Sequence, residues 1–121
     1  MFTIFPIKYP DIPKSIIKDI AKCNNLVAFL AEENNVSIGY ILAETEQVDV
    51  MKIIEVNLYG SNDYDRVILD AMLKAVVSYA KNMGTAMIRF QPSSLIENFS
   101  NTGLISSDCI EVSKFSFSCR G

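Results

Sequence analysis

Residues 56–84, VNLYGSNDYDRVILDAMLKAVVSYAKNMG, join a strand-like run to the strongest helical pattern of the chain. The run Met51–Leu58 is rich in β-branched and aliphatic residues, which favours a strand. After the connector, apolar residues recur at helical spacing from about Tyr64 to Asn82, and Gly84 is placed to end the helix. A strand that leads into a helix N-terminus directs unpaired backbone N–H groups toward one point. The join therefore predicts an anion-binding position at the start of this helix.

Charged residues crowd the start of the same helix. Asp63 and Asp65 lie there beside a single cation, Arg66. The simplest explanation of the two carboxylates is that they cap the helix and complement its dipole. Beside a bound phosphate they would instead repel the ligand, and Arg66 would offset part of that repulsion.

The rest of the chain alternates between strand and helix patterns. Turn-forming residues at 32–35 separate two apolar runs, which predicts an antiparallel hairpin. Pro10 ends the first strand, and Asp11 can cap a helix whose apolar face carries Ile12, Ile16, Ile20 and Cys23. The expected strands are Phe2–Ile7, Leu26–Ala31, Ser37–Glu44, Met51–Leu58, Thr85–Phe90 and Ile110–Cys119, with a further short helix over Pro92–Asn101. This order predicts a single α+β domain over residues 1–121.

Composition excludes several classes of partner and site. Half of the residues are hydrophobic, the net charge is −3, and the chain contains no histidine. The acidic balance and the absence of a Lys/Arg run argue against nucleic acid and anionic membrane as partners. Three widely spaced cysteines without histidine fit free thiols in the cytoplasm better than a disulfide framework or a metal site. The apolar runs are too short to span a bilayer, and the start lacks a signal-peptide pattern.

Four stretches, in this order, resemble the GNAT superfamily of acyl-CoA-dependent N-acyltransferases. They are IKYPDIPKSIIKDI (7–20), LVAFLAEENNVSIGYILAE (26–44), the run from Ile53 to Gly84, and LIENFSNTGL (95–104). The resemblance implies an α/β sandwich-like fold with a mixed, mostly antiparallel sheet and helices on both faces. It also implies a splay between the middle strands in which acetyl-CoA lies, with no metal.

The resemblance also implies which residues contact the cofactor. In the family the pyrophosphate rests on a Gln/Arg-x-x-Gly-x-Gly/Ala turn, whose glycines let the backbone approach closely. That turn falls on residues 64–69, after the end of the preceding strand, so the implied cofactor-binding residues are Leu58, Tyr59, Tyr64, Asp65, Arg66, Val67, Ile68 and Leu69. Tyr64 replaces the basic or amide residue, and Val67 and Leu69 replace both small residues. The loop is therefore a degenerate version of the motif.

Two catalytic positions of the family are changed as well. The tyrosine that protonates the departing thiolate falls on Phe99, and an asparagine that supports the cofactor falls on Pro92. The general base that relatives place on the fourth strand matches Glu55. Alternation puts Glu55, Asn57 and Tyr59 on one face of that strand and Ile54, Val56 and Leu58 on the other. Glu55 is then either a catalytic base or an ordinary exposed carboxylate.

Two functions remain open from the sequence. The first is an acetyl-CoA-dependent N-acetyltransferase that acts on an unidentified small-molecule amine and works mainly by orientation. The second is an inactive GNAT-fold protein that binds another ligand or serves as a protein-interaction module, for example as a homodimer. The overall layout favours the enzyme, whereas Asp65, Val67, Leu69, Pro92 and Phe99 favour the inactive module. The acidic balance suits a cationic substrate better than an anionic one.

Overall fold

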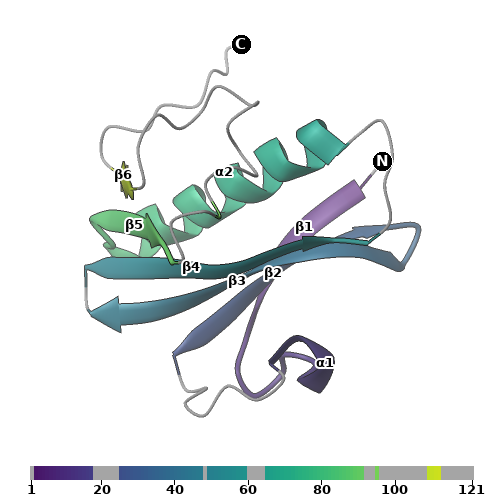
Figure 1. Ribbon diagram of the computed structural model, residues 1–121, viewed down its shortest axis with the longest axis horizontal. Helices are drawn as coiled ribbons and strands as arrows, with labels where there is room; N and C mark the ends of the chain where they lie inside the picture. The colour runs from purple at the N-terminus through teal and green to yellow at the C-terminus, as the bar shows by residue number, and fades with distance from the viewer. Residues whose placement is uncertain are drawn as a thin grey trace.

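The computed structural model describes residues 2–17, 25–47, 49–59, 65–91, 95 and 109–112. The strands within these residues form one sheet in the order β1-β2-β3-β4-β5-β6. Their bounds are β1 (Phe2–Lys8), β2 (Leu26–Glu33), β3 (Val36–Gln47), β4 (Val50–Leu58), β5 (Met87–Phe90) and β6 (Cys109–Glu111). Two helices accompany them, α1 (Lys14–Ile17) and α2 (Asp65–Met83) (Figure 1).

The sheet is antiparallel except at one position. β1 to β4 pair as a meander of antiparallel strands, β4 and β5 are parallel, and β6 is antiparallel to β5. The predicted hairpin is confirmed, but its turn is shorter than residues 32–35. Asn34 and Asn35 both have positive φ, 54° and 69°, the backbone of a tight two-residue turn that asparagine tolerates. The flanking strands consequently extend to Glu33 and from Val36.

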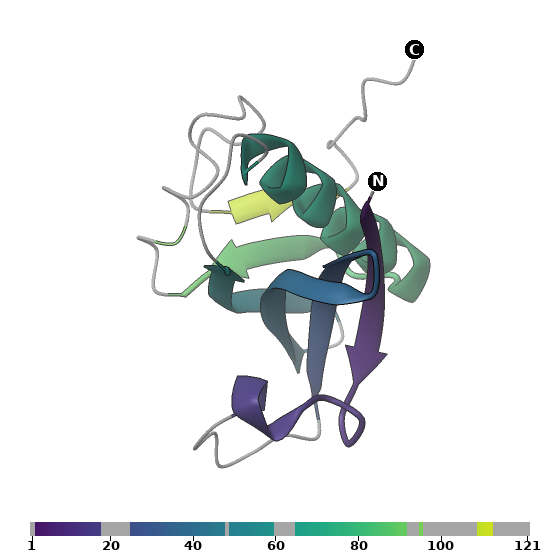
Figure 2. The same ribbon diagram turned by 90° about the vertical axis from the view of Figure 1, so that its right-hand side faces the viewer.

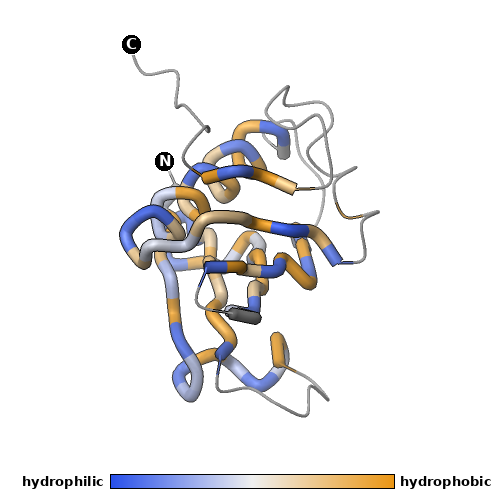
Figure 3. Tube along the Cα trace, turned by 90° about the vertical axis from the view of Figure 1, so that its left-hand side faces the viewer, coloured by the Kyte–Doolittle hydropathy of each residue, from blue (hydrophilic) through white to orange (hydrophobic). Residues whose placement is uncertain are grey.

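The two helices cover opposite faces of the sheet, as Figures 1 and 2 show. On the α2 face, one core cluster joins buried residues of the helix, such as Met72, Val76 and Val77, to inward-facing strand residues such as Phe29 and Ile53. Along the α2 tube in Figure 3, hydrophobic and hydrophilic colours alternate, as expected for a helix with one buried stripe.

A second, smaller core lies on the α1 face. Ile16 and Ile17 of α1, together with Ile12, pack there against buried strand residues that include Leu26 and Tyr40. The predicted helix after Asp11 is therefore confirmed as far as Ile17, whereas the expected apolar positions Ile20 and Cys23 lie outside the described residues. The fold is a sheet with a helix on each face, as the resemblance implies.

The end of α2 is fixed by the glycine that the sequence indicated. Gly84 has a φ of +79°, and its N–H donates to the Lys81 carbonyl at 3.2 Å. The Thr85 N–H donates to the Ala80 carbonyl at 2.8 Å, which completes a Schellman motif. The chain then enters β5. The Ala86 and Met87 N–H groups both donate to the Asp49 carbonyl, which fixes the start of β5 beside the start of β4.

The last predicted elements are described only in part. β6 covers Cys109–Glu111 of the strand expected over Ile110–Cys119. Of the helix expected over Pro92–Asn101, the described residue is Leu95, which packs against the α2-side core. None of the helices described is long and apolar enough to cross a membrane.

Candidate functional site

β5 pairs with only the first part of β4. β4 has nine residues, but its register with β5 covers Val50–Ile53 against Met87–Phe90. The Gln91 N–H donates to the Ile53 carbonyl at 2.9 Å, at the end of this ladder. β4 continues to Leu58 while staying paired with β3. β5 ends at Phe90, so β4 has an edge beyond Ile53 that β5 does not cover. The space along this edge, where the resemblance implies that the middle strands part, is called the splay below.

A β-bulge lies at the point where the splay begins. Glu55 is opposite Leu42 on β3, whereas Ile53 is opposite the next β3 residue, Ala43, so Ile54 is an extra residue. A bulge shifts the two-residue alternation of a strand by one position and bends it. β4 therefore changes phase and direction at the residue where it leaves β5.

The bulge corrects one prediction about the faces of β4. The sequence placed Ile54 on the same face as Val56 and Leu58, but Ile54 packs against the core on the α1 face. Val56 and Leu58 pack against the core on the α2 face. The prediction was wrong because it assumed an unbroken alternation. A signal was present, since the adjacent apolar residues Ile53 and Ile54 mark the point where one alternating pattern ends and another begins.

The expected polar face of β4 is confirmed, and it lies on the α1 side of the sheet. Glu55 is opposite the buried Leu42, and Asn57 is opposite the buried Tyr40, both of which belong to the α1-side core. The Tyr59 ring follows, with its centroid 6.1 Å from that of Tyr40. Glu55 and Asn57 are half-buried and Tyr59 is 46% exposed. A carboxylate, an amide and a phenol thus follow one another along the outer half of β4.

The backbone of the same segment is directed toward the splay at alternate residues. The Tyr59 N–H donates to the Ile38 carbonyl at 2.9 Å, so Tyr59 bonds to β3. In an antiparallel ladder the residues between such pairs point their N–H and C=O groups the other way. Val56 and Leu58 therefore present backbone donors and acceptors on the β5 side of β4, beyond the end of β5, and no strand of the described chain covers them there.

On the β3 side of this segment, Gly39 lets the two strands approach closely. A Cβ atom on Gly39 would lie 2.6 Å from the Asn57 carbonyl oxygen and 2.6 Å from Leu58 Cδ2. Only a residue without a side chain allows β3 and the end of β4 to approach so closely. Gly39 lies in the stretch 26–44 that resembles the GNAT superfamily, and its role here is to set the position of β4.

The start of α2 lies at the carboxyl end of β4, since the helix begins at Asp65, shortly after Leu58 (Figure 1). Ile68 is 4% exposed and Leu69 is partly buried, and both pack into the α2-side core. Arg66 is exposed and Val67 is 55% exposed. The side chains of Ile68 and Leu69 therefore fix the helix to the sheet. Cofactor contact by the backbone of this turn stays a prediction.

Several predicted positions cannot be placed in this site. Tyr64, Pro92 and Phe99 lie outside the described residues, and so does the side chain of Asp65. Leu58 contributes its side chain to the core, so only its backbone is available to the splay. Among the described residues, no group of three or more His, Cys, Asp or Glu side chains could hold a metal ion.

Solved structures with a similar fold are known. A GNAT family acetyltransferase from Elizabethkingia anophelis with acetyl-CoA bound matches 88% of this chain and 78% of its own, with 20% identity and a TM-score of 0.62. An IAA acetyltransferase from Bacillus cereus matches 88% and 79%, with 17% identity and a TM-score of 0.61. The ribosomal-protein-S18-alanine N-acetyltransferase of Escherichia coli matches 85% and 77%, with 16% identity and a TM-score of 0.58.

No protein-family model matches the sequence, and no curated protein matches it. The likeness is therefore one of structure. The chain has the GNAT fold, including the mostly antiparallel sheet, the helices on both faces and the splay between β4 and β5.

Proposed function

We propose that this chain, which has the GNAT fold, is an acetyl-CoA-dependent N-acetyltransferase that acts on a small amine. The observation that carries the proposal is that pairing with β5 ends at Ile53 while β4 continues to Leu58, because this leaves the backbone of Val56 and Leu58 directed toward the splay. An open strand edge binds extended, amide-bearing ligands through main-chain hydrogen bonds. Ligands of open sheets also bind beyond the carboxyl ends of parallel strands, where β4 and α2 meet.

The residues present fit acetyl-CoA at the strand edge better than at the start of the helix. The pantetheine arm of the cofactor contains two amides, which match the alternating donors and acceptors of Val56 and Leu58. At the helix, Arg66 supplies a positive charge, and the first-turn N–H groups supply donors for phosphate oxygens. Val67 carries a β-branched side chain where the family has a small residue, so this turn grips phosphate less closely. When bound, acetyl-CoA supplies an activated thioester acyl group.

Glu55 is the residue we assign to proton transfer. It lies one residue after the bulge, on the α1 face, whereas the helix that would hold the phosphates covers the opposite face. An amine that approaches from the α1 side therefore meets Glu55 without displacing the groups near α2. Glu55 accepts a proton from the substrate ammonium, directly or through one water, and so leaves a neutral nucleophilic amine.

The electrostatics of the polar face suit a cationic acceptor. Glu55 and Asn57 both offer oxygen acceptors, and the partly exposed Tyr59 ring gives an aromatic surface beside them. Ammonium groups bind carboxylates and aromatic faces well, whereas an anionic substrate would be repelled by Glu55. The net charge of −3 acts in the same direction.

One observation favours the alternative, an inactive GNAT-fold protein that binds a different ligand or a partner. Val67 is 55% exposed in the first turn of α2, so its bulk is not buried in the core and stands where a phosphate would approach. Calorimetric titration with acetyl-CoA and with free CoA, followed by an assay of thiol release with a panel of amines, separates the two functions. Binding with amine-dependent thiol release supports the enzyme. A lack of binding at millimolar acetyl-CoA overturns it.

A further inference from the structure

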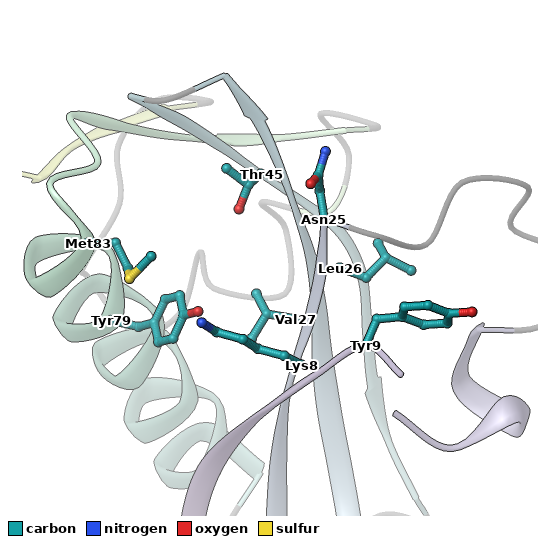
Figure 4. A pocket seen from close by; sticks show the side chains of 8 residues that line it. All are labelled: Lys8, Tyr9, Asn25, Leu26, Val27, Thr45, Tyr79 and Met83. Carbon is teal, nitrogen blue, oxygen red and sulfur yellow. The ribbon is translucent and has the colours of Figure 1, made fainter. Parts of the chain in front are cut away.

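A cavity lies at the opposite end of the sheet from the splay. It has a volume of about 210 Å³ and is bounded by the end of β1, the start of β2, the end of β3 and the last turns of α2. Figure 4 shows Lys8, Thr45, Tyr79 and Met83 around the space between the sheet and the helix, while the Tyr9 ring points away from it. None of these residues takes part in the proposed acetyl-transfer site.

The polar side chains of the cavity are rich in hydrogen-bond donors. The side chains of Lys8, Thr45 and Tyr79 point toward the same space (Figure 4), and Asn25 adds an amide at the rim. Lys8 offers three N–H donors and a positive charge, while Tyr79 and Thr45 each offer one O–H. Within the described part of the chain, no acidic residue lines the cavity. Such a set binds a ligand that accepts several hydrogen bonds and carries negative charge.

These donors are not engaged elsewhere in the described part of the chain. Lys8 takes part in neither the Lys52–Glu44 nor the Lys74–Asp70 ion pair. Tyr79 is half-buried, and its ring packs against Phe29, which leaves its hydroxyl group available. A buried tyrosine hydroxyl usually finds a hydrogen-bond partner. An oxyanion bound in the cavity would accept hydrogen bonds from both the Tyr79 hydroxyl and the Lys8 ammonium group.

The cavity is held in shape before any ligand enters. The Tyr9 N–H donates to the Leu26 carbonyl at 3.3 Å, and the Thr45 N–H donates to the Asn25 carbonyl at 2.9 Å, so the rim is tied together by backbone bonds. The Tyr79 ring is braced edge-on by Phe29, with centroids 5.4 Å apart and planes at 86°. The backbone of the rim and the Tyr79 ring are thus fixed in advance, whereas Lys8 is exposed. Groups fixed in advance lose little entropy on binding, which favours affinity.

The helix end beside the cavity does not oppose an anion strongly. The C-terminus of a helix carries partial negative charge on its unpaired carbonyl groups. Here the carbonyls of Ala80 and Lys81 already accept hydrogen bonds from Thr85 and Gly84. Among the described residues that line the cavity, Lys8 is the one that carries a charge.

The walls and the size of the cavity determine the size and polarity of the remainder of the ligand. Val27 is buried at its floor, and the Tyr79 ring and the thioether of Met83 form apolar sides. Its volume is below the range of about 300–1,000 Å³ typical of sites for drug-sized ligands. The geometry points to a second binding site, independent of acetyl transfer, for a small organic carboxylate whose carboxylate meets Lys8 and Tyr79 and whose apolar body packs on Val27 and Met83.

Benzoate is a suitable probe, with neutral benzamide and inorganic phosphate as comparisons. Titrations of the full chain are followed by calorimetry and by amide chemical shifts. We expect benzoate to bind more tightly than benzamide or phosphate, and to shift the amides of Val27, Thr45 and Tyr79 rather than those of Val56 and Leu58.

Variants complete the test. Lys8→Gln should weaken benzoate binding by about tenfold or more, because it removes a charge-assisted hydrogen bond. Tyr79→Phe, which keeps the ring packing on Phe29, should also weaken it. Lys14→Gln removes an exposed lysine outside the cavity and should leave it unchanged. The inference is overturned if benzoate does not bind at millimolar concentration, if benzamide or phosphate binds as well as benzoate, or if Lys8→Gln and Lys14→Gln behave alike.

Discussion

Gly39 lies directly opposite Leu58 across the β3–β4 ladder, and a Cβ atom on Gly39 would stand 2.6 Å from Leu58 Cδ2. The same atom would stand 2.6 Å from the Asn57 carbonyl oxygen. The leucine side chain can move, but the carbonyl belongs to the backbone of β4. The position of the end of β4, which borders the splay, thus depends on the absence of a side chain at residue 39 of the neighbouring strand β3.

We predict that Gly39→Ala moves the end of β4 and weakens acetyl-CoA binding. The strain should also lower the free energy of unfolding by about 1–3 kcal/mol, the usual cost of overpacking. Denaturant unfolding measures the stability, and calorimetry measures the dissociation constant.

Gly84→Ala is the matched control for this change. Gly84 has a φ of +79°, which costs an alanine roughly 1–2 kcal/mol, but it lies at the other end of α2 from the splay. It should lower stability without changing the dissociation constant for acetyl-CoA. If both variants weaken acetyl-CoA binding equally, the effect of Gly39→Ala comes from general destabilisation, and the role assigned to Gly39 is wrong.

We predict that Glu55→Gln lowers kcat by about 10²-fold or more, the usual contribution of a general base, with little change in acetyl-CoA affinity. Glutamine keeps the size and polarity of the side chain but cannot take the proton. Steady-state thiol release with a reactive amine measures kcat, and calorimetry measures affinity.

Glu44→Gln provides the comparison, because Glu44 is a carboxylate on the same sheet that pairs with Lys52 at 3.8 Å. We expect it to leave kcat unchanged. Equal turnover of the Glu55→Gln variant and the unaltered protein would remove Glu55 from the reaction.

Val67→Gly should raise the affinity for acetyl-CoA, because it exposes the backbone N–H groups of the first turn of α2 to phosphate oxygens. The change should also lower stability by about 0.5 kcal/mol, from the poorer helix propensity of glycine. Ser78→Gly, at an exposed position further along the same helix, carries a similar stability cost away from the ligand. Unchanged affinity in the Val67→Gly variant would show that this turn does not contact the cofactor.

Much of the fold could be predicted from the sequence, because its signals are local. The apolar stripe of α2 and Gly84 after it gave the helix to within one residue at each end. The Asn34–Asn35 pair marked the hairpin, although the turn proved tighter than the polar stretch suggested. The resemblance to the GNAT superfamily then implied the splay, which periodicity alone could not give, since it depends on how β4 and β5 pair.

The site was less predictable, because its geometry depends on contacts between distant residues. The bulge at Ile54 left only a change of phase in the sequence, and an unbroken alternation put Ile54 on the wrong face. The cavity at the other end of the sheet joins Lys8, Thr45 and Tyr79, which are far apart in the chain and share no motif. The spacing of these residues along the sequence therefore could not predict that they line one cavity.

The central claim is that the β5-facing backbone of β4 beyond Ile53 is an open edge that binds acetyl-CoA. Hydrogen exchange of individual amides by NMR tests it most directly. Without ligand, we expect the Val56 and Leu58 N–H groups to exchange faster than that of Tyr59, which is bonded to Ile38. Saturating acetyl-CoA should then slow exchange at Val56 and Leu58. Slow exchange of these two amides in the free protein, or rates that acetyl-CoA leaves unchanged, would contradict the claim.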